Sequence, residues 1–285
     1  MLCMKGVIVA AGYGTRFLPV TKTIPKEMIP LIDKPSIAFI VEEFIASGIQ
    51  DIIIITSRRK RALEDFLDRE IELESVFERE GAAKKLKAVA PYKARFFFVR
   101  QQEMRGTGHA MMQMKPIIGN EPFVVAYPDD LHFGEVPLAK QLISTYEETG
   151  CTVLATLHDP PDINRYAVLE LATDNFHVTD IEEKPPKGKE KSKEASIGRF
   201  LYTPDFMEYL EEGWNRHAAE NNPGEYFHTY GLDRLIEKNK VVYKRVEGER
   251  LDIGAPSGYL EAIIRHASTV PELRDVLENV LKKTL

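Results

Sequence analysis

The sequence predicts an α/β fold, in which a doubly wound, mostly parallel, Rossmann-like sheet is followed by a smaller mixed α+β part. Short continuous apolar runs such as Lys5–Ala11 (KGVIVAA) and Asp51–Thr56 (DIIIIT) are typical of buried parallel strands. Between them, in Pro35–Gly48, apolar residues recur at the three- and four-residue spacing of an amphipathic helix. Strand, loop, helix and strand form a βαβ unit, for which we expect a right-handed crossover.

The same alternation continues along the first half of the chain. The loop Gly12–Pro30 follows the first strand, and Gly48 is the expected C-cap of the first helix. We expect further strands at Arg95–Arg100, Pro122–Tyr127 and Thr152–Leu157, and helices at Gly108–Met114 and Leu138–Glu148. The charged stretch Glu70–Lys87 is predicted to be a helical excursion on the surface.

After about Asp159 the pattern changes to shorter strands with loops between them, and Lys187–Glu194 (KGKEKSKE) is predicted to be a solvated loop. The expected strands are Tyr166–Leu171, Val178–Glu182, Ser196–Tyr202 and Val241–Val246. The expected helices are Pro204–Arg216, Tyr230–Lys238, Pro256–Ala267 and Pro271–Lys282. We therefore treat residues 1–285 as one domain with two halves, about 1–158 and about 159–285.

Composition narrows the class of protein. A chain of 285 residues with 44% hydrophobic content can bury a core without disulfides or structural metal. The net charge of −6 argues against a nucleic-acid partner. Cys3 and Cys151 form no zinc or redox motif, and no apolar run approaches the roughly 20 residues of a membrane span. We expect a cytoplasmic protein with no membrane association.

The first strand is followed by Gly12-Tyr-Gly14-Thr-Arg-Phe17, in which the glycines allow backbone N–H groups to converge on an anion. Phe17 stands where the dinucleotide fingerprint needs a third glycine, which argues against a dehydrogenase, and no Walker A loop is present. Arg16, Lys22 and Lys26 lie in the same proline-rich loop. Cations beside a glycine turn at the carboxyl end of a strand favour a phosphate site over a solvated basic loop.

Carboxylates follow other predicted strands. Asp129 and Asp130 end one, and Asp252 with Gly254 ends another. Such residues could meet over the sheet and share a hard cation. Each taken alone is better explained as a turn former or helix cap.

At this point the residues resemble a known family. Gly12–Arg16 together with Pro25–Pro30 (PKEMIP) is similar to the signature of sugar-1-phosphate nucleotidylyltransferases, in the variant of the bacterial UTP–glucose-1-phosphate uridylyltransferases. The resemblance runs the length of the chain. Further matching blocks are Asp33–Pro35, Val99–Gln101, Gly106–Ala110, Pro128-Asp129, Glu183–Pro185, Gly198-Arg199, Asp252–Gly254 and Gly258-Tyr259.

The resemblance implies a nucleotide-binding first half, a sugar-binding second half with the C-terminal helices, and a role for each matching residue. Nucleotide-binding residues would be Ala11, Gly12, Gly14, Thr15, Gln101, Gly106 and Asp129. Catalytic residues would be Arg16, Lys26 and Lys184. Sugar-binding residues would be Tyr166, Glu183 and Gly198. Asp129 and Asp252 would hold Mg²⁺, the substrates would be UTP and glucose 1-phosphate, and the enzyme would be a homo-oligomer (dimer or tetramer).

Three positions depart from the family pattern. Tyr166 is followed by Ala167 instead of glycine, Tyr230 replaces the aspartate that ends the Gln-Leu-Thr-Asp block, and Gln102 replaces a glycine that often follows the Arg-Gln pair. The alternatives are thymidylyl or cytidylyl transfer to a sugar 1-phosphate, or a non-catalytic nucleotide-sugar sensor.

The implied reaction needs no general base. A phosphate monoester has a second pKa near 6, so the sugar phosphate oxygen that attacks the α-phosphorus is already largely ionised at neutral pH. His109 is accordingly predicted to shape the nucleotide pocket, not to act as a base. The obstacle is the approach of two polyanions, which cations must offset.

Overall fold

One sheet of nine strands runs through the molecule in a computed structural model that describes residues 4–220 and 222–284. Cys3 therefore lies outside the described residues. The strands of the main sheet are β1 (Lys5–Val9), β4 (Asp51–Thr56), β5 (Arg95–Arg100), β6 (Phe123–Ala126), β8 (Thr152–His158), β9 (Ala167–Leu171), β10 (Val178–Glu183), β11 (Glu194–Tyr202) and β12 (Val241–Arg245). Small two-stranded sheets pair β2 (Pro30–Leu31) with β3 (Lys34–Pro35), and β7 (Asp130–Phe133) with β13 (Glu249–Asp252).

The parallel part of the sheet is the predicted one. Strands β6, β1, β4 and β5 lie side by side and are all parallel. The second half of the chain joins this core antiparallel, because β11 pairs with β6, β8 and β9. The α/β prediction with a mixed second part is confirmed. The two sequence halves share one sheet, since β8 of the first half lies between β11 and β12 of the second.

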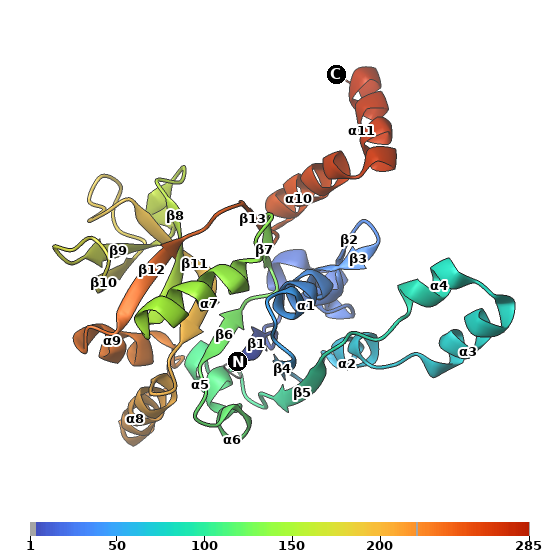
Figure 1. Cartoon of the computed structure of the whole chain (residues 1–285). Helices are drawn as coiled ribbons and strands as arrows, with labels where there is room; N and C mark the ends of the chain where they lie inside the picture. The colour runs from blue at the N-terminus through green and yellow to red at the C-terminus, as the bar shows by residue number, and fades with distance from the viewer. Residues whose placement is uncertain (1–3, 221, 285) are drawn as a thin grey trace.

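Helices cover both faces of the sheet (Figure 1). They are α1 (Ser36–Ala46), α2 (Arg61–Leu67), α3 (Ile71–Glu80), α4 (Ala83–Ala88), α5 (Thr107–Met112), α6 (Lys115–Ile118), α7 (Leu138–Thr149), α8 (Phe206–Ala219), α9 (Thr229–Glu237), α10 (Pro256–Thr269) and α11 (Pro271–Thr284). In Figure 1 the pairs α3–α4 and α10–α11 project from the body. No helix of the described residues is long and apolar enough to cross a membrane.

Two buried clusters hold these layers together. The fully buried residues Ile52 and Ile54 of β4 belong to the cluster that contains Phe44 of α1, whereas Ile53 and Ile55 belong to the cluster on the other side. Alternation of this kind follows from the two-residue period of a strand. It explains why the parallel strands read as unbroken apolar runs in the sequence.

Several details differ from the sequence prediction. Glu194, which was expected in a solvated loop, begins β11 and is 2% exposed, because His158, Arg245 and the Thr156 hydroxyl all bond to its carboxylate. The prediction for that residue is wrong. The first helix ends at Ala46 with Ser47 as its C-cap, and Gly48 follows with a φ of 87°. Strands β2, β3 and β7 were not predicted, and Asp130, which was predicted to end the preceding strand, begins β7.

Candidate functional site

The glycine turn after β1 lines a cavity of about 300 Å³. Gly14 has a φ of 70°, a conformation that favours glycine, and its carbonyl oxygen accepts a hydrogen bond of 2.7 Å from the Thr21 hydroxyl. Six predicted nucleotide-binding residues line this one cavity: Ala11, Gly12, Gly14, Thr15, Gln101 and Gly106. The cavity also contacts Met104, Thr107 and Glu225, to which the sequence reading gave no role.

Gln101 closes one wall of this cavity. It is 3% exposed, and its Nε2 donates to the Gly106 carbonyl oxygen at 3.2 Å. Its Oε1 has no hydrogen-bond partner within the described part of the chain. Gly106 has a φ of 93°, and a Cβ there would overlap the backbone of Tyr226. The amide is therefore held in place with its oxygen free to accept a hydrogen bond.

A cation and a carboxylate meet where β1 and β6 end. Nζ of Lys26 lies 2.6 Å from Oδ2 of Asp129, and both side chains are about one-fifth exposed. Burial disfavours the charged carboxylate, but the Lys26 ammonium outweighs it and holds the pKa of Asp129 below its usual value. Arg16 lies close by, with Nη1 donating to the Gly254 carbonyl oxygen at 3.0 Å. The predicted residues Arg16, Lys26 and Asp129 thus form one cluster.

Asp252 joins this cluster from β13. The Ile253 N–H donates to the Asp129 carbonyl oxygen at 2.9 Å, and the Gly254 N–H donates to Oδ1 of Asp252 at 2.9 Å. A Cβ built on Gly254 would lie 3.0 Å from Asp129 Oδ2, from Asp252 Oδ1 and from Arg16 Nη1. One point near Gly254 is therefore within reach of both carboxylates.

These two carboxylates fit a magnesium ion. Mg²⁺ prefers oxygen ligands, keeps several waters and needs only one or two protein carboxylates beside substrate phosphates. Within residues 4–220 and 222–284 no group of three or more His, Cys, Asp or Glu side chains could hold a metal. Asp129 Oδ2 and Asp252 Oδ1, which both lie near Gly254, could share one cation.

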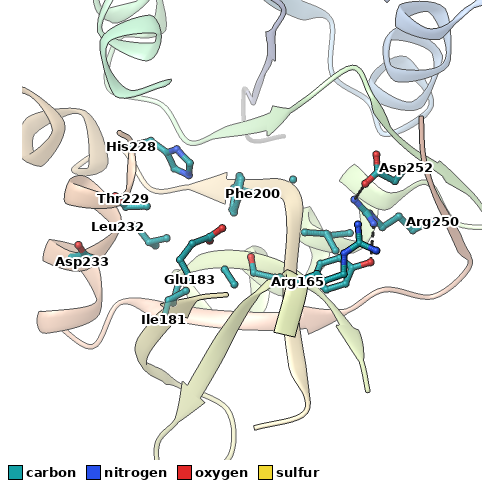
Figure 2. Close-up of a pocket in the computed structure, with 15 residues that line it drawn as sticks. Arg165, Ile181, Glu183, Phe200, His228, Thr229, Leu232, Asp233, Arg250 and Asp252 are labelled. Carbon is teal, nitrogen blue, oxygen red and sulfur yellow. Dashed lines mark hydrogen bonds and ion pairs between the residues drawn. The ribbon is translucent and has the colours of Figure 1, made fainter. Parts of the chain in front are cut away.

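A second cavity, of about 520 Å³, opens on the other side of Asp252 (Figure 2). The predicted sugar-binding residues Tyr166, Glu183 and Gly198 all line it. So do residues without a predicted role: Arg165, Ala167, Ile181, Ser196, Ile197, Phe200, His228, Thr229, Leu232, Asp233 and Arg250. Because Asp252 belongs to this wall and to the charged cluster, the second cavity adjoins the Lys26 and Asp129 pair.

Arg250, which lines the second cavity, forms a buried ion pair with Asp130. Arg250 donates to both carboxylate oxygens of Asp130, at 2.8 Å and 3.1 Å. The Gly198 N–H donates to Oδ2 of Asp130 at 3.0 Å, and a Cβ at Gly198 would lie 3.0 Å from that oxygen and 3.1 Å from Tyr127. A bidentate pair fixes orientation as well as charge. A side chain at position 198 would press on this pair, which favours glycine there.

Lys184 lies apart from the other predicted catalytic residues. Its Nζ pairs with Oε1 of Glu183 at 3.4 Å, and its side chain is 67% exposed. It follows β10 with a φ of 50°, and its backbone N–H donates to the Tyr166 carbonyl oxygen at 3.0 Å. Lys184 does not line the cavity, whereas its neighbour Glu183 does.

Two of the departures from the family pattern, Ala167 and Tyr230, lie in different parts of the structure. Ala167 lines the second cavity, but Tyr230 packs on Gly213 of α8, and its hydroxyl donates to Glu212 at 3.2 Å. Two residues before it, His228 lines the cavity instead. The block Glu225–Tyr230 (EYFHTY) departs from the family pattern in the sequence, and His228 is the residue of this block that the structure places at the cavity beside Thr229.

Next to the Lys26 and Asp129 pair lies a second buried ion pair. Nζ of Lys60 is 2.6 Å from Oε2 of Glu27, and the two side chains are 4% and 0% exposed. Burial raises the pKa of Glu27 and lowers that of Lys60, while each partner opposes the shift of the other. Since Glu27 follows Lys26 directly, this pair anchors the loop that carries Lys26.

Comparison with known proteins defines the class. The model of the nucleotidyl transferase family matches residues 5–268. This chain belongs to that family. The chain is 40% identical to proteins named UTP–glucose-1-phosphate uridylyltransferase from Staphylococcus epidermidis and from Staphylococcus haemolyticus, over 98% of this chain and 97% of each relative. Similarity of this extent places it in the UTP–glucose-1-phosphate uridylyltransferase group of the family.

Solved structures agree. A UDP-glucose pyrophosphorylase complexed with UDP-glucose is 35% identical, with a TM-score of 0.80 over 95% of this chain and 100% of that chain. A UTP-bound enzyme of the same type from Acinetobacter baumannii is 28% identical, with a TM-score of 0.87 over the whole of both chains.

Proposed function

We propose that this enzyme transfers the uridylyl group of UTP to glucose 1-phosphate, giving UDP-glucose and pyrophosphate. The observation that carries the proposal is the order of the site: the glycine-lined cavity, the Lys26, Asp129 and Asp252 cluster, and the second cavity adjoin one another in that sequence. A nucleotide in the first cavity and a sugar in the second would bring their phosphates to the cluster between them.

The reaction joins the sugar phosphate to the α-phosphorus and expels pyrophosphate. A like-charge pair at 4 Å costs about 4 kcal/mol at an effective dielectric of 20, so bringing two polyanions together is the main barrier to positioning. Arg16 and Lys26 offset this repulsion and stabilise the charge that develops on the leaving pyrophosphate. Lys184 would bind the sugar phosphate, which requires its exposed side chain to leave Glu183 and turn toward the cluster.

Asp129 and Asp252 would hold Mg²⁺, and when bound the ion would neutralise phosphate charge and orient the triphosphate. The free Oε1 of Gln101 would accept the N3–H of uracil, and the backbone at Gly106 would complete the contact with the base. Glu183 would bind hydroxyl groups of the sugar from the wall of the second cavity.

The enzyme would work in the cytoplasm as a homo-oligomer. Exposed apolar side chains on the projecting helices α10 and α11 support the oligomer, among them Leu260 (58% exposed) and Val276 (59% exposed).

The test is a pyrophosphate-release assay over a grid of UTP, dTTP and CTP against several sugar 1-phosphates. Turnover with UTP and glucose 1-phosphate above all other pairs is expected. Binding of UDP-glucose with no turnover of any pair would instead identify a nucleotide-sugar sensor.

A further inference from the structure

His228 occupies a defined place in the second cavity. It precedes α9 and lines the wall, together with Glu183 from β10 (Figure 2). Its ring lies 5.4 Å from the Phe200 ring and 6.5 Å from the Tyr127 ring, measured between centroids. The aromatic neighbours restrict the orientation of the imidazole.

The backbone that carries His228 is fastened to the nucleotide side of the site. The Gly108 N–H donates to the Tyr226 carbonyl oxygen at 2.9 Å, and the Tyr226 N–H donates to the Arg105 carbonyl oxygen at 2.8 Å. Side chains at Gly106 or Gly108 would collide with the backbone of Tyr226 or Phe227. The chain segment before α9 therefore cannot shift without disturbing the base-binding loop.

Thr107 contacts one of the two ring nitrogens of His228. Its Oγ1 accepts the backbone N–H of His228 at 3.4 Å and lies 2.9 Å from Nδ1 of the ring. The hydroxyl of Thr107 can donate its own proton to Nδ1, and in that arrangement the ring proton resides on Nε2. Nε2 has no hydrogen-bond partner among residues 4–220 and 222–284.

The ring is also neutral. Burial lowers the pKa of His228 to about 4, so the imidazole is uncharged at neutral pH. A neutral N–H donor without a protein partner, at the wall of this cavity, is available to an acceptor oxygen of a ligand.

We propose that His228 determines sugar specificity: its Nε2–H donates a hydrogen bond to a hydroxyl oxygen of the pyranose ring, and Thr107 is the positioning residue that fixes the tautomer. This inference rests on the proposed function and deepens it. The substrate class is a hexose 1-phosphate whose sugar ring is uncharged and carries an oxygen at that position. A sugar with hydrogen there leaves the buried donor unpaired and is disfavoured.

Two amide variants separate the nitrogens of the ring. The amide of glutamine overlays Nε2 of a histidine, and that of asparagine overlays Nδ1. We expect His228→Gln to keep kcat/KM for glucose 1-phosphate within about three-fold, and His228→Asn and His228→Leu to lower it by at least about ten-fold. The KM for UTP should change less than three-fold in all of them. Thr107→Val removes the hydroxyl but keeps the shape of the side chain. Its kcat/KM for glucose 1-phosphate should lie between those of His228→Gln and His228→Leu.

Deoxyglucose 1-phosphates identify the oxygen. In the wild type one of the 2-, 3-, 4- or 6-deoxy sugars should lose at least ten-fold relative to glucose 1-phosphate, and in His228→Leu the same sugar should lose little. Such non-additivity is the signature of a direct contact. Thermal melting of each variant checks the fold.

The proposal is overturned if kcat/KM for glucose 1-phosphate falls as far in His228→Gln as in His228→Leu, or if the kinetic constants for UTP worsen as much as those for the sugar phosphate. It is also overturned if every deoxy sugar loses as much rate in His228→Leu as in the wild type. If the wild type uses a different sugar 1-phosphate, the proposed function fails while the His228 contact is measured with that sugar and its deoxy forms. If no pair turns over, calorimetric binding of UDP-glucose by the same variants decides the contact.

Discussion

Nζ of Lys26 lies 2.6 Å from Oδ2 of Asp129 and joins the proline-rich loop after β1 to the end of β6. The pair holds a cation beside the proposed metal ligand before any substrate is bound. A cation bound to Asp129 would leave the Lys26 ammonium free to contact the substrate phosphates. Replacing it with methionine keeps much of its shape but removes the charge, so Lys26→Met should lower kcat by about 10²- to 10³-fold. Steady-state pyrophosphate release measures it, and a loss below ten-fold would contradict the assignment.

Asp252 should control the metal dependence of the reaction. Its carboxylate is 57% exposed, and its Oδ1 accepts the Gly254 N–H, so Asp252→Asn removes charge without opening the core. We expect turnover to fall by at least about 100-fold and the Mg²⁺ concentration for half-maximal rate to rise. Glu147→Gln on the exposed surface of α7 is the matched control and should leave both quantities unchanged. An unaltered Mg²⁺ titration for Asp252→Asn would exclude it as a ligand.

Lys184 should act on one substrate more than on the other. A point charge that meets only the sugar phosphate contributes to binding of that substrate and to the transition state. Lys184→Ala should therefore lower kcat/KM for glucose 1-phosphate by about 100-fold while the binding constant for UTP changes little. Lys187→Ala, in the exposed loop nearby, is the control. Equal losses for both substrates would point to a structural role.

Ala167 adds a methyl group to the wall of the second cavity. A methyl group in a pocket changes discrimination by about 1–3 kcal/mol, so Ala167→Gly should preserve or raise turnover of glucose 1-phosphate and widen the range of accepted epimers. The same magnitude applies to the single methyl that separates dTTP from UTP. We expect UTP first, dTTP second and CTP poor. A preference for CTP would show that Gln101 contacts the base differently.

The neutral His228 makes stability depend on pH. Its pKa is about 4 in the folded protein and about 6.5 in the unfolded chain, so below pH 6.5 the unfolded state binds more protons. Stability is therefore lost as pH falls from 6.5 toward 4. The free energy of unfolding of wild type minus that of His228→Leu should decrease by on the order of 2 kcal/mol over this window. Urea titrations measure it, and a constant difference would mean that the imidazole titrates normally.

Local sequence patterns were enough for much of the fold. Strands β4 and β5 begin and end at the predicted residues. Every residue of β4 is buried, and a strand buried on both faces must be apolar throughout, whereas β5 lies at the edge of the sheet and is partly exposed. The glycine turn was recognisable because backbone that approaches an anion closely needs residues without a side chain. Six of the predicted nucleotide-binding residues line one cavity because they follow β1 and β5, parallel strands of one sheet whose carboxyl ends lie at the same edge.

The sequence by itself determined one βαβ unit of the parallel core and no further strand order. It also indicated a phosphate-binding site, because glycines and cations follow the first strand. The tertiary structure decided what depends on contacts between distant segments. Pairing of β13 with β7 places Asp252 beside Asp129. Packing of the segment before α9 on Gly106 and Gly108 turns His228 into the second cavity and Tyr230 toward α8. Glu194 looked solvated because its neighbours are charged, yet its own partners lie on β8 and β12. Such pairings depend on where the backbone brings remote residues together, and the spacing of residues along the chain carries no record of them.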